Sequence, residues 1–402
     1  MTALKRTALF DMHRRLGARM APFAGWEMPL WYSSAREEHL AVRQAAGLFD
    51  VSHMGVFEVS GRAAAITLDH LTTNDVSTLP IGRAQYTYVL DSNGDVIDDI
   101  MLYRVADARY LVVVNAANAD KDWAWFTQHS SEGCAWRDLR GTEADQERRA
   151  DIALQGPRSL DVLCSLLDSA EAETLKALPF TGVMHTNLLG CDVYIARTGY
   201  TGERVAYELF VHPQHSVALW EALLQRGSEL GVRPCGLAAR DSLRIEAGLP
   251  LYGHELAGPL NLLPFHIDFD HFVKVNKSAD FIGKSAYLAR REANTLRSVR
   301  FRMNERGVRV AKLGDPVLDR RGRVIGTVTS CAMDGSGMLI GLAVVDVDEA
   351  REGNTLFVVA LPERLPEPLK PFAPLGSRIP MPEPATVLPR FLSRRTGANS
   401  AK

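Results

Sequence analysis

The stretch AQYTYVLDSNGDVIDDIMLYRV, residues 84–105, predicts an antiparallel β-hairpin. Apolar and polar residues alternate on both sides of Ser92-Asn93-Gly94, three residue types that favour a turn. The same alternation occurs in GVFEVSG, residues 55–61, and in ARYLVVVNA, residues 108–116. We therefore expect this part of the chain to form an antiparallel sheet.

The segments on either side of this sheet combine strand and helix patterns. Ser34, followed three residues later by Glu37, has the spacing of a capping box, and it predicts a helix from about Ala35 to Ala46. Residues 151–167 predict a strand, a Gly-Pro break and a helix, whereas residues 191–211 predict two strands around a glycine-rich turn. A further helix is expected over residues 215–231, so the first two thirds of the chain are predicted to be mixed α+β.

The pattern changes near Leu296 to short strands separated by glycine-rich or charged turns, which is typical of a small β-barrel. Pro362 to Pro389 is dense in proline, and we expect an extended surface arm there because proline disfavours helices and central strands. The predicted domains are residues 1–285, with two intertwined α+β lobes, and residues 286–390, with the barrel and the arm. Residues 391–402 are predicted to be a disordered tail.

Composition excludes several classes of protein. The 402 residues carry a formal net charge of −2, so no overall basic field would hold nucleic acid or an anionic membrane. The five cysteines are scattered singly, which argues against a metal cluster or a disulfide framework. Without a signal peptide or a long apolar run, the chain is predicted to be a soluble cytoplasmic protein, with organelle targeting by its basic N-terminus as the alternative.

Eight segments resemble, in order and spacing, the aminomethyltransferase (T-protein) family of the glycine cleavage system. They are FAGWEMPLWY (23–32), GLFDVSHMG (47–55), QYTYVLDSNGDVIDDIMLYR (85–104), VVNAAN (113–118), LQGP (154–157), RTGYTGE (197–203), GLAARDSLRIEAGLPLYGHEL (236–256) and FIGKSA (281–286). The resemblance implies an α+β fold, a three-domain cloverleaf around a central folate cavity with a C-terminal β-barrel. It also implies transfer of an aminomethyl group from the dihydrolipoyl arm of H-protein to tetrahydrofolate, with release of ammonia and no requirement for a metal.

Asp98 and Asp99 are adjacent on a predicted strand, so their side chains should point to opposite faces of the sheet. The resemblance places Asp99 at the position of the carboxylate that contacts the pterin and supports attack by its N5 atom. Alone, the Asp-Asp pair would be read as a solvated strand edge. With the surrounding motif, we predict that Asp99 is the catalytic residue.

The resemblance also assigns a set of folate-binding residues. They are Met54, Tyr86, Asn115, Tyr200, Glu208 and Arg240. A glutamate can accept two hydrogen bonds from an aminopyrimidine edge, and an arginine fork suits the carboxylates of a folate tail. The loop before Glu208 is one residue longer than the family pattern, which leaves open that Glu208 is displaced or that Tyr207 enters the pocket.

Other residues are assigned weaker roles. His53 and His254 lie beside no recognisable nucleophile or metal-ligand partner, so we expect structural or channel roles. For the lipoylated H-protein, a basic contact surface is expected, and Lys284, Arg290 and Arg291 are the candidates.

Two alternative functions remain open. Residues 257–277 depart from the family pattern, which leaves a tetrahydrofolate-dependent demethylase of a small methylated donor as one alternative. The other is a non-catalytic folate-binding factor for iron-sulfur assembly. Those relatives carry a cysteine near the position of Phe281 to Lys284, and this chain has none there.

Overall fold

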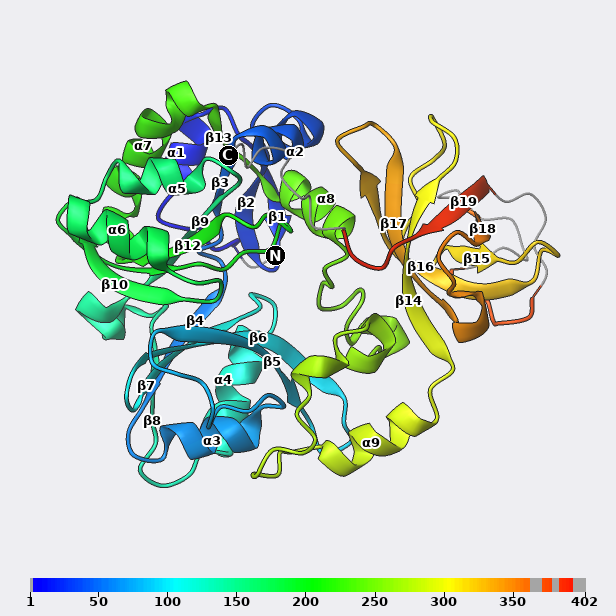
Figure 1. Ribbon diagram of the computed structural model, residues 1–402, viewed down its shortest axis with the longest axis horizontal. Helices are drawn as coiled ribbons and strands as arrows, with labels where there is room; N and C mark the ends of the chain where they lie inside the picture. The colour runs from blue at the N-terminus through cyan, green and yellow to red at the C-terminus, as the bar shows by residue number, and fades with distance from the viewer. Residues whose placement is uncertain (1–2, 362–370, 378–382, 393–402) are drawn as a thin grey trace, which may run out of the picture.

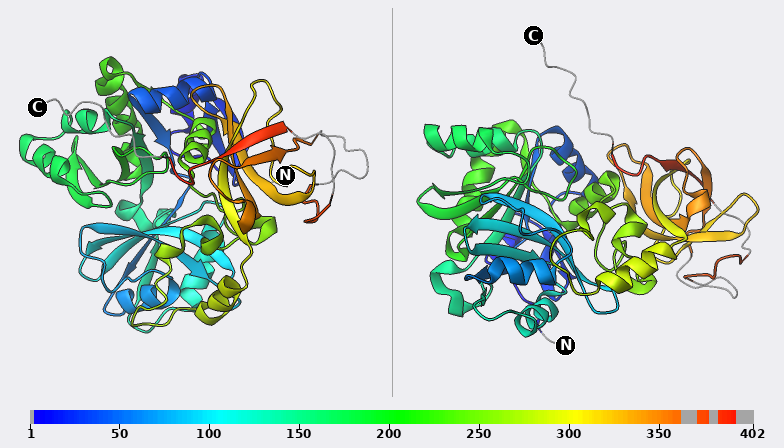
Figure 2. Two further views of the ribbon diagram at one scale, coloured as in Figure 1. Left: turned by 45° about the vertical axis from the view of Figure 1, so that its right-hand side comes forward. Right: turned by 60° about the horizontal axis from the view of Figure 1, so that its bottom comes forward.

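A computed structural model describes residues 3–361, 371–377 and 383–392. Three bodies surround the middle of the molecule, built on a six-stranded sheet, a five-stranded sheet and a closed barrel (Figure 1). The right-hand view of Figure 2 shows the barrel to one side of the two sheets. The prediction of a mixed α+β fold with a C-terminal β-barrel is confirmed.

The five-stranded sheet contains the predicted hairpin. Its strand order is β5-β6-β7-β4-β8, and neighbouring strands are antiparallel. The strands are β4 (Gly55–Ser60), β5 (Arg83–Leu90), β6 (Val96–Ala106), β7 (Arg109–Val114) and β8 (Ala135–Asp138). One face packs on α3 (Ala64–Leu71) and α4 (Ala119–Gln128), through Ile100 and Leu102 of β6 among others. The strands β4 to β7 were predicted, whereas β8 and the helices α3 and α4 were not.

The six-stranded sheet has the order β10-β11-β12-β9-β3-β13. Its strands are β3 (Ala46–Asp50), β9 (Ala150–Gln155), β10 (Val183–Leu188), β11 (Cys191–Ala196), β12 (Ala206–Val211) and β13 (Val232–Pro234). One face is covered by α1 (Phe10–Arg15), α5 (Ser159–Cys164), α6 (Ser169–Ala177) and α7 (Pro213–Gly227). The short helices η1 (Thr142–Glu147) and η2 (Ser228–Leu230) lie in its connections.

The two sheets meet through their remaining faces. Tyr103 of β6 and Phe210 of β12 belong to one buried cluster, with ring centroids 5.2 Å apart. Because side chains alternate along a strand, Asp99 shares a face with Tyr103, and Glu208 shares a face with Phe210. The fold therefore directs Asp99 and Glu208 toward the same interface from opposite sheets.

The barrel is closed by strands in the order β14-β17-β16-β15-β18-β19. They are β14 (Leu296–Met303), β15 (Pro316–Leu318), β16 (Val324–Met333), β17 (Leu339–Asp346), β18 (Thr355–Val358) and β19 (Glu383–Leu388), with η6 (Val347–Glu349) between β17 and β18. The expectation of a strand-free arm up to Pro389 was wrong for β19, which pairs with both β14 and β18. Residues 362–370 and 378–382 of the arm lie outside the described residues, as do residues 393–402 of the predicted tail.

The remaining elements connect the three bodies. They are the hairpin β1 (Arg19–Phe23) with β2 (Trp26–Trp31), the helices α2 (Ala35–Gln44), α8 (Leu237–Ala247) and α9 (Lys284–Glu292), and the turns η3 (Gly258–Leu260), η4 (Pro264–Ile267) and η5 (Asp270–Phe272). Ser34 caps α2 as predicted, because its side chain accepts a hydrogen bond from the Glu37 N–H at 3.2 Å. Within the described ranges, every helix is too short or too polar to cross a bilayer.

Candidate active site

Asp99 is held by two side chains that the sequence had also singled out. The Tyr86 hydroxyl donates to Asp99 Oδ2 at 2.7 Å, and Asn115 Nδ2 donates to Asp99 Oδ1 at 3.0 Å. Tyr86 comes from β5 and Asn115 directly follows β7, so three neighbouring strands supply the group. Asp98 points to the opposite face as expected, and it is fully buried, whereas Asp99 is partly exposed.

The surroundings of Asp99 bring the pKa of its carboxyl group close to neutral pH. Burial raises the pKa of Asp99 to about 7, and the negative charge of Asp98 adds to the rise. The hydrogen bonds from Tyr86 and Asn115 act in the opposite direction because they stabilise the ionised form. A carboxyl group of this kind is half ionised at neutral pH and can stabilise a developing positive charge.

Glu208 is held by two hydroxyl groups. The Tyr103 hydroxyl donates to Glu208 Oε2 at 3.0 Å, and the Thr198 hydroxyl donates to the same oxygen. Tyr207, by contrast, is buried in the core beneath the helices of the six-stranded sheet. The longer loop therefore does not move Tyr207 into the interface between the sheets.

Tyr200 and Arg240 form a second pair of predicted residues. The Arg240 guanidinium lies over the Tyr200 ring, 5.0 Å from its centroid, and Arg240 Nη1 is buried without a hydrogen-bond partner among the described residues. The Tyr200 hydroxyl donates to the Pro250 carbonyl, which fixes the ring. Burial is the main cause that raises the pKa of Tyr200, and the Asp99 charge contributes.

Met54 is packed between the two clusters that join the sheets and α8, as expected of an apolar wall. The structure thus brings Tyr86, Asp99 and Asn115 into direct contact, and Tyr200 with Arg240 into another. Glu208 contacts neither group directly and is held by Tyr103 and Thr198.

An aromatic wall surrounds Tyr86 and was not predicted. Phe272 and Phe269 lie with ring centroids 5.0 Å and 6.2 Å from that of Tyr86. Both come from the segment 257–277 that departs from the family pattern. Phe391 packs on Phe269 at 5.4 Å, so residues just beyond the barrel reach the outer side of this wall. Periodicity gives no warning of it because the segment forms short turns.

Sequence reasoning also missed two buried acids near the site. Asp151 of β9 is 2% exposed, and burial followed by the Glu208 charge raises its pKa. A lone acid in the otherwise apolar strand ADIAL was the signal that could have found it. Asp122 of α4 is equally buried, and no local motif marks it.

The two histidines for which we expect structural or channel roles take different positions. His53 is buried, and burial lowers its pKa to about 4, so it is neutral at pH 7. His254 Nδ1 contacts the Thr329 carbonyl of the barrel at 3.0 Å. His254 therefore takes part in the junction between the barrel and the segment after α8, in agreement with a structural role.

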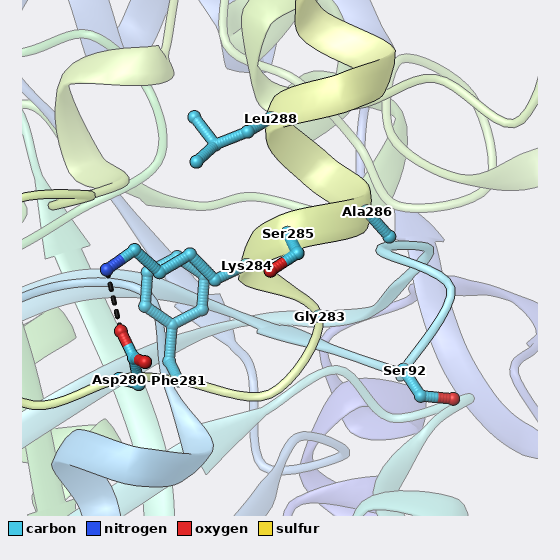
Figure 3. A pocket seen from close by; sticks show the side chains of 8 residues that line it. All are labelled: Ser92, Asp280, Phe281, Gly283, Lys284, Ser285, Ala286 and Leu288. Atoms are coloured by element: carbon cyan, nitrogen blue, oxygen red, sulfur yellow. Dashed lines mark hydrogen bonds and ion pairs between the residues drawn. The ribbon is translucent and has the colours of Figure 1, made fainter.

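A pocket of about 470 Å³ lies where α9 begins (Figure 3). Its lining includes Phe281, Lys284 and Ser285 of the FIGKSA segment and Ser92 from the β5–β6 turn, and it includes none of the predicted site residues. The three basic candidates on α9 are all neutralised by aspartates. Lys284 pairs with Asp280 at 2.7 Å, Arg290 pairs with Asp95, and Arg291 pairs with Asp270 at 3.2 Å.

The chain is similar to known proteins over most of its length. Residues 9–277 match the GCVT N-terminal domain family. An aminomethyltransferase of Symbiobacterium thermophilum is 43% identical over 360 residues, covering 89% of this chain and 93% of that protein. The aminomethyltransferase of Bacillus subtilis is 39% identical over 357 residues, covering 88% and 94%.

A solved structure of an aminomethyltransferase has a similar fold. The crystal structure of the glycine cleavage system aminomethyltransferase T from Bartonella henselae superposes with a TM-score of 0.80 at 30% identity. That match covers 96% of this chain and 97% of the other. The chain belongs to the aminomethyltransferase (T-protein) family of the glycine cleavage system, and it is a transferase.

Proposed function

We propose that this enzyme transfers the aminomethyl group of a dihydrolipoyl arm to tetrahydrofolate. The observation that carries the proposal is the Asp99 carboxyl group, held by Tyr86 and Asn115 on a sheet face that meets the sheet of Glu208. The carbon loses its bonds to sulfur and to the amine nitrogen and gains bonds to N5 and N10 of the folate. The two protons leaving N5 and N10 go to the thiolate and the amine, which leaves as ammonia.

Asp99 acts in this scheme on the charge that develops at N5. As N5 attacks the aminomethyl carbon, the nitrogen becomes positive, and the ionised carboxylate stabilises it and then receives its proton. A positioned group of this kind contributes about 10² to 10⁴ in rate. Tyr86 and Asn115 keep the carboxylate aligned without large motion during the reaction.

The folate would be held by the remaining predicted residues. Glu208 makes both of its hydrogen bonds through Oε2, which leaves Oε1 to accept from an aminopyrimidine edge. Arg240 Nη1 is buried without a partner among the described residues, which fits pairing with a folate carboxylate. Met54 and Tyr200 supply apolar and aromatic walls.

The donor in this proposal is lipoylated H-protein, and the place of action is the cytoplasm. Support comes from the T-protein family membership and from relatives named as aminomethyltransferases, which disfavour the demethylase and the iron-sulfur assembly alternatives. Because Lys284, Arg290 and Arg291 are each paired with an aspartate, the docking surface is left unassigned.

The experiment measures methylene-tetrahydrofolate formed from aminomethylated H-protein and tetrahydrofolate. We expect Asp99→Asn to lower turnover by about 10² to 10⁴ while folate binding persists. Asp107→Asn is the matched control because Asp107 lies in the turn after β6 with its side chain 92% exposed. Folate binding without turnover in the wild-type protein would favour another donor or a non-catalytic role, and a fully active Asp99→Asn enzyme would refute the role of Asp99.

A further inference from the structure

Asp122 is an acidic side chain enclosed behind the candidate site. It lies on α4 and is 0% exposed, and no N–H or hydroxyl donor among the described residues reaches either of its carboxyl oxygens. The neighbouring charge that acts on it most strongly is that of the Asp98 carboxyl group, which is also 0% exposed. Two neighbouring carboxylates cannot both be ionised where water is excluded, so one of them keeps a proton.

The proton belongs on Asp122. Asp98 already accepts from Asn115 N at 2.9 Å, Asn115 Nδ2 at 2.8 Å and Asn118 Nδ2 at 2.6 Å, which stabilises its ionised form. Asp122 has no comparable donors, and burial followed by the Asp98 charge raises the pKa of Asp122 to about 10. At neutral pH, Asp122 is therefore the donor of a hydrogen bond to the Asp98 carboxylate.

This pair is connected to Asp99 through one amide. Asn115 Nδ2 donates to Asp98 Oδ1 at 2.8 Å and to Asp99 Oδ1 at 3.0 Å. The position of Asp98 thus fixes Asn115, and Asn115 helps to fix Asp99. The single negative charge on Asp98 also disfavours a second charge on Asp99.

We propose that Asp98 and Asp122 share one proton as a buried pair that positions Asn115 and keeps a single negative charge behind Asp99. Both are positioning residues, since neither lies on the face that meets the second sheet. The inference rests on the proposed role of Asp99. Other ionisable groups facing the three acids are Tyr86 and Tyr88 of β5, Lys121 of α4 and Tyr200.

Lys121 does not replace the proton on Asp122. Its ammonium group donates to the Ile97 carbonyl at 2.6 Å, to Asn118 Oδ1 at 3.1 Å and to the Tyr252 hydroxyl at 3.0 Å. The Lys121 charge lowers the pKa of Asp122, but burial and the Asp98 charge outweigh it. The pair therefore remains singly protonated.

The first test is the pH dependence of kcat in the double variant Asp98→Asn/Asp122→Asn. The variant removes the charge behind Asp99, so the acid midpoint of kcat should fall by about one to two pH units. The single variant Asp122→Asn keeps a donor for the Asp98 carboxylate, and its midpoint should stay at the wild-type value. Asp120→Asn, on the same helix with its side chain 82% exposed, is the matched control.

The second test does not depend on turnover. At mildly alkaline pH, the infrared difference spectrum between wild type and Asp122→Asn should contain the carbonyl band of one protonated carboxyl group. Asp151 is present in both proteins and cancels from this difference. Because asparagine and aspartate have nearly the same volume, Asp122→Asn should also fold, which circular dichroism verifies.

The outcomes separate this inference from the proposed function. An active Asp99→Asn enzyme would refute the role of Asp99 and leave the infrared test valid. A missing infrared band would overturn the shared proton, and an unmoved midpoint in a folded double variant would overturn the effect on Asp99.

Discussion

Tyr86 is the hydrogen-bond donor whose loss should be most visible in the ionisation of Asp99. Tyr86→Phe removes the 2.7 Å bond to Asp99 Oδ2, which stabilises the ionised carboxylate. A hydrogen bond to a charged group contributes about 1.5–3 kcal/mol, so the pKa of Asp99 should rise by about one to two units above 7. Turnover at pH 7 should therefore fall about tenfold and recover as pH rises, which a kcat profile measures.

The control for this change is Tyr110→Phe in the same sheet. Tyr110 is also buried, and its hydroxyl has no hydrogen-bond partner among the described residues. We expect it to leave the acid midpoint of kcat in place. Equal midpoints in Tyr86→Phe and wild type would show that the tyrosine does not tune Asp99.

At the scale of single residues, the sequence predicted side chains that belong to motifs, but it did not predict the residues that surround them. Strand alternation alone predicted that Asp98 and Asp99 point in opposite directions, and the structure confirms it. Asp122 was missed because its partner lies on another element, so no local spacing connects them. The aromatic wall of Phe269 and Phe272 was missed for the same reason.

At the scale of elements, the turn between β5 and β6 has a testable requirement for glycine. Gly94 has φ +77°, and an added Cβ would lie 2.8 Å from the backbone nitrogen of Tyr287 in α9. Gly94→Ala therefore adds backbone strain and a contact that a flexible side chain cannot relieve. We expect a loss of about 1–3 kcal/mol in the free energy of unfolding, measured by denaturant titration.

Gly190→Ala separates the two causes of that loss. Gly190 has φ +82°, and an added Cβ there would meet no atom within 4 Å. It should show the backbone strain without the clash, and thus a smaller loss of stability. If both variants lose the same stability, the packing of α9 on the turn contributes nothing.

Local sequence signals predicted those helices and strands that are determined by residues close together in the chain. The Ser34 cap located the start of α2, and the Ser92-Asn93-Gly94 turn located the β5–β6 hairpin. The strand β19 was missed because proline lacks a backbone donor. Its ladder nevertheless forms, with Pro384 opposite Phe357 and Ala385 opposite Met303. Those partners are distant in sequence, so only closure of the barrel defines the strand.

At the scale of the whole molecule, composition and pattern predicted the mixed fold and the barrel but not the meeting of the sheets. The predicted domain boundary at 285–286 remains a prediction, and it falls inside α9. Strand β9 inserts between β12 and β3, which are far from each other along the chain. That order brings the face of Glu208 against the face of Asp99, and no periodicity encodes it.

Arg244 joins α8 to the barrel through buried polar contacts. Its Nη1 donates to Glu255 Oε2 at 2.7 Å, and its Nη2 donates to Ser330 Oγ of β16 at 2.8 Å. Glu255 is 0% exposed. Burial alone would raise the pKa of Glu255, but chiefly the Arg244 charge lowers it below its usual value. The pair therefore contributes stability above the unfolded pKa of about 4.3 and loses it in acid.

Arg244→Met should lower the free energy of unfolding by about 3–5 kcal/mol at pH 7, because Glu255 stays buried without its cation. The deficit should shrink as pH falls toward 4, because in the variant the buried Glu255, with no cation beside it, takes up a proton in the folded state. Calorimetry across pH measures this deficit.

The double variant Arg244→Met/Glu255→Gln should recover part of the loss, since no buried charge remains. Arg158→Met, which breaks an exposed pair with Asp161, is the control and should cost at most about 1 kcal/mol. A deficit independent of pH would attribute the effect to lost packing, and the barrel would then not depend on this ion pair for its attachment.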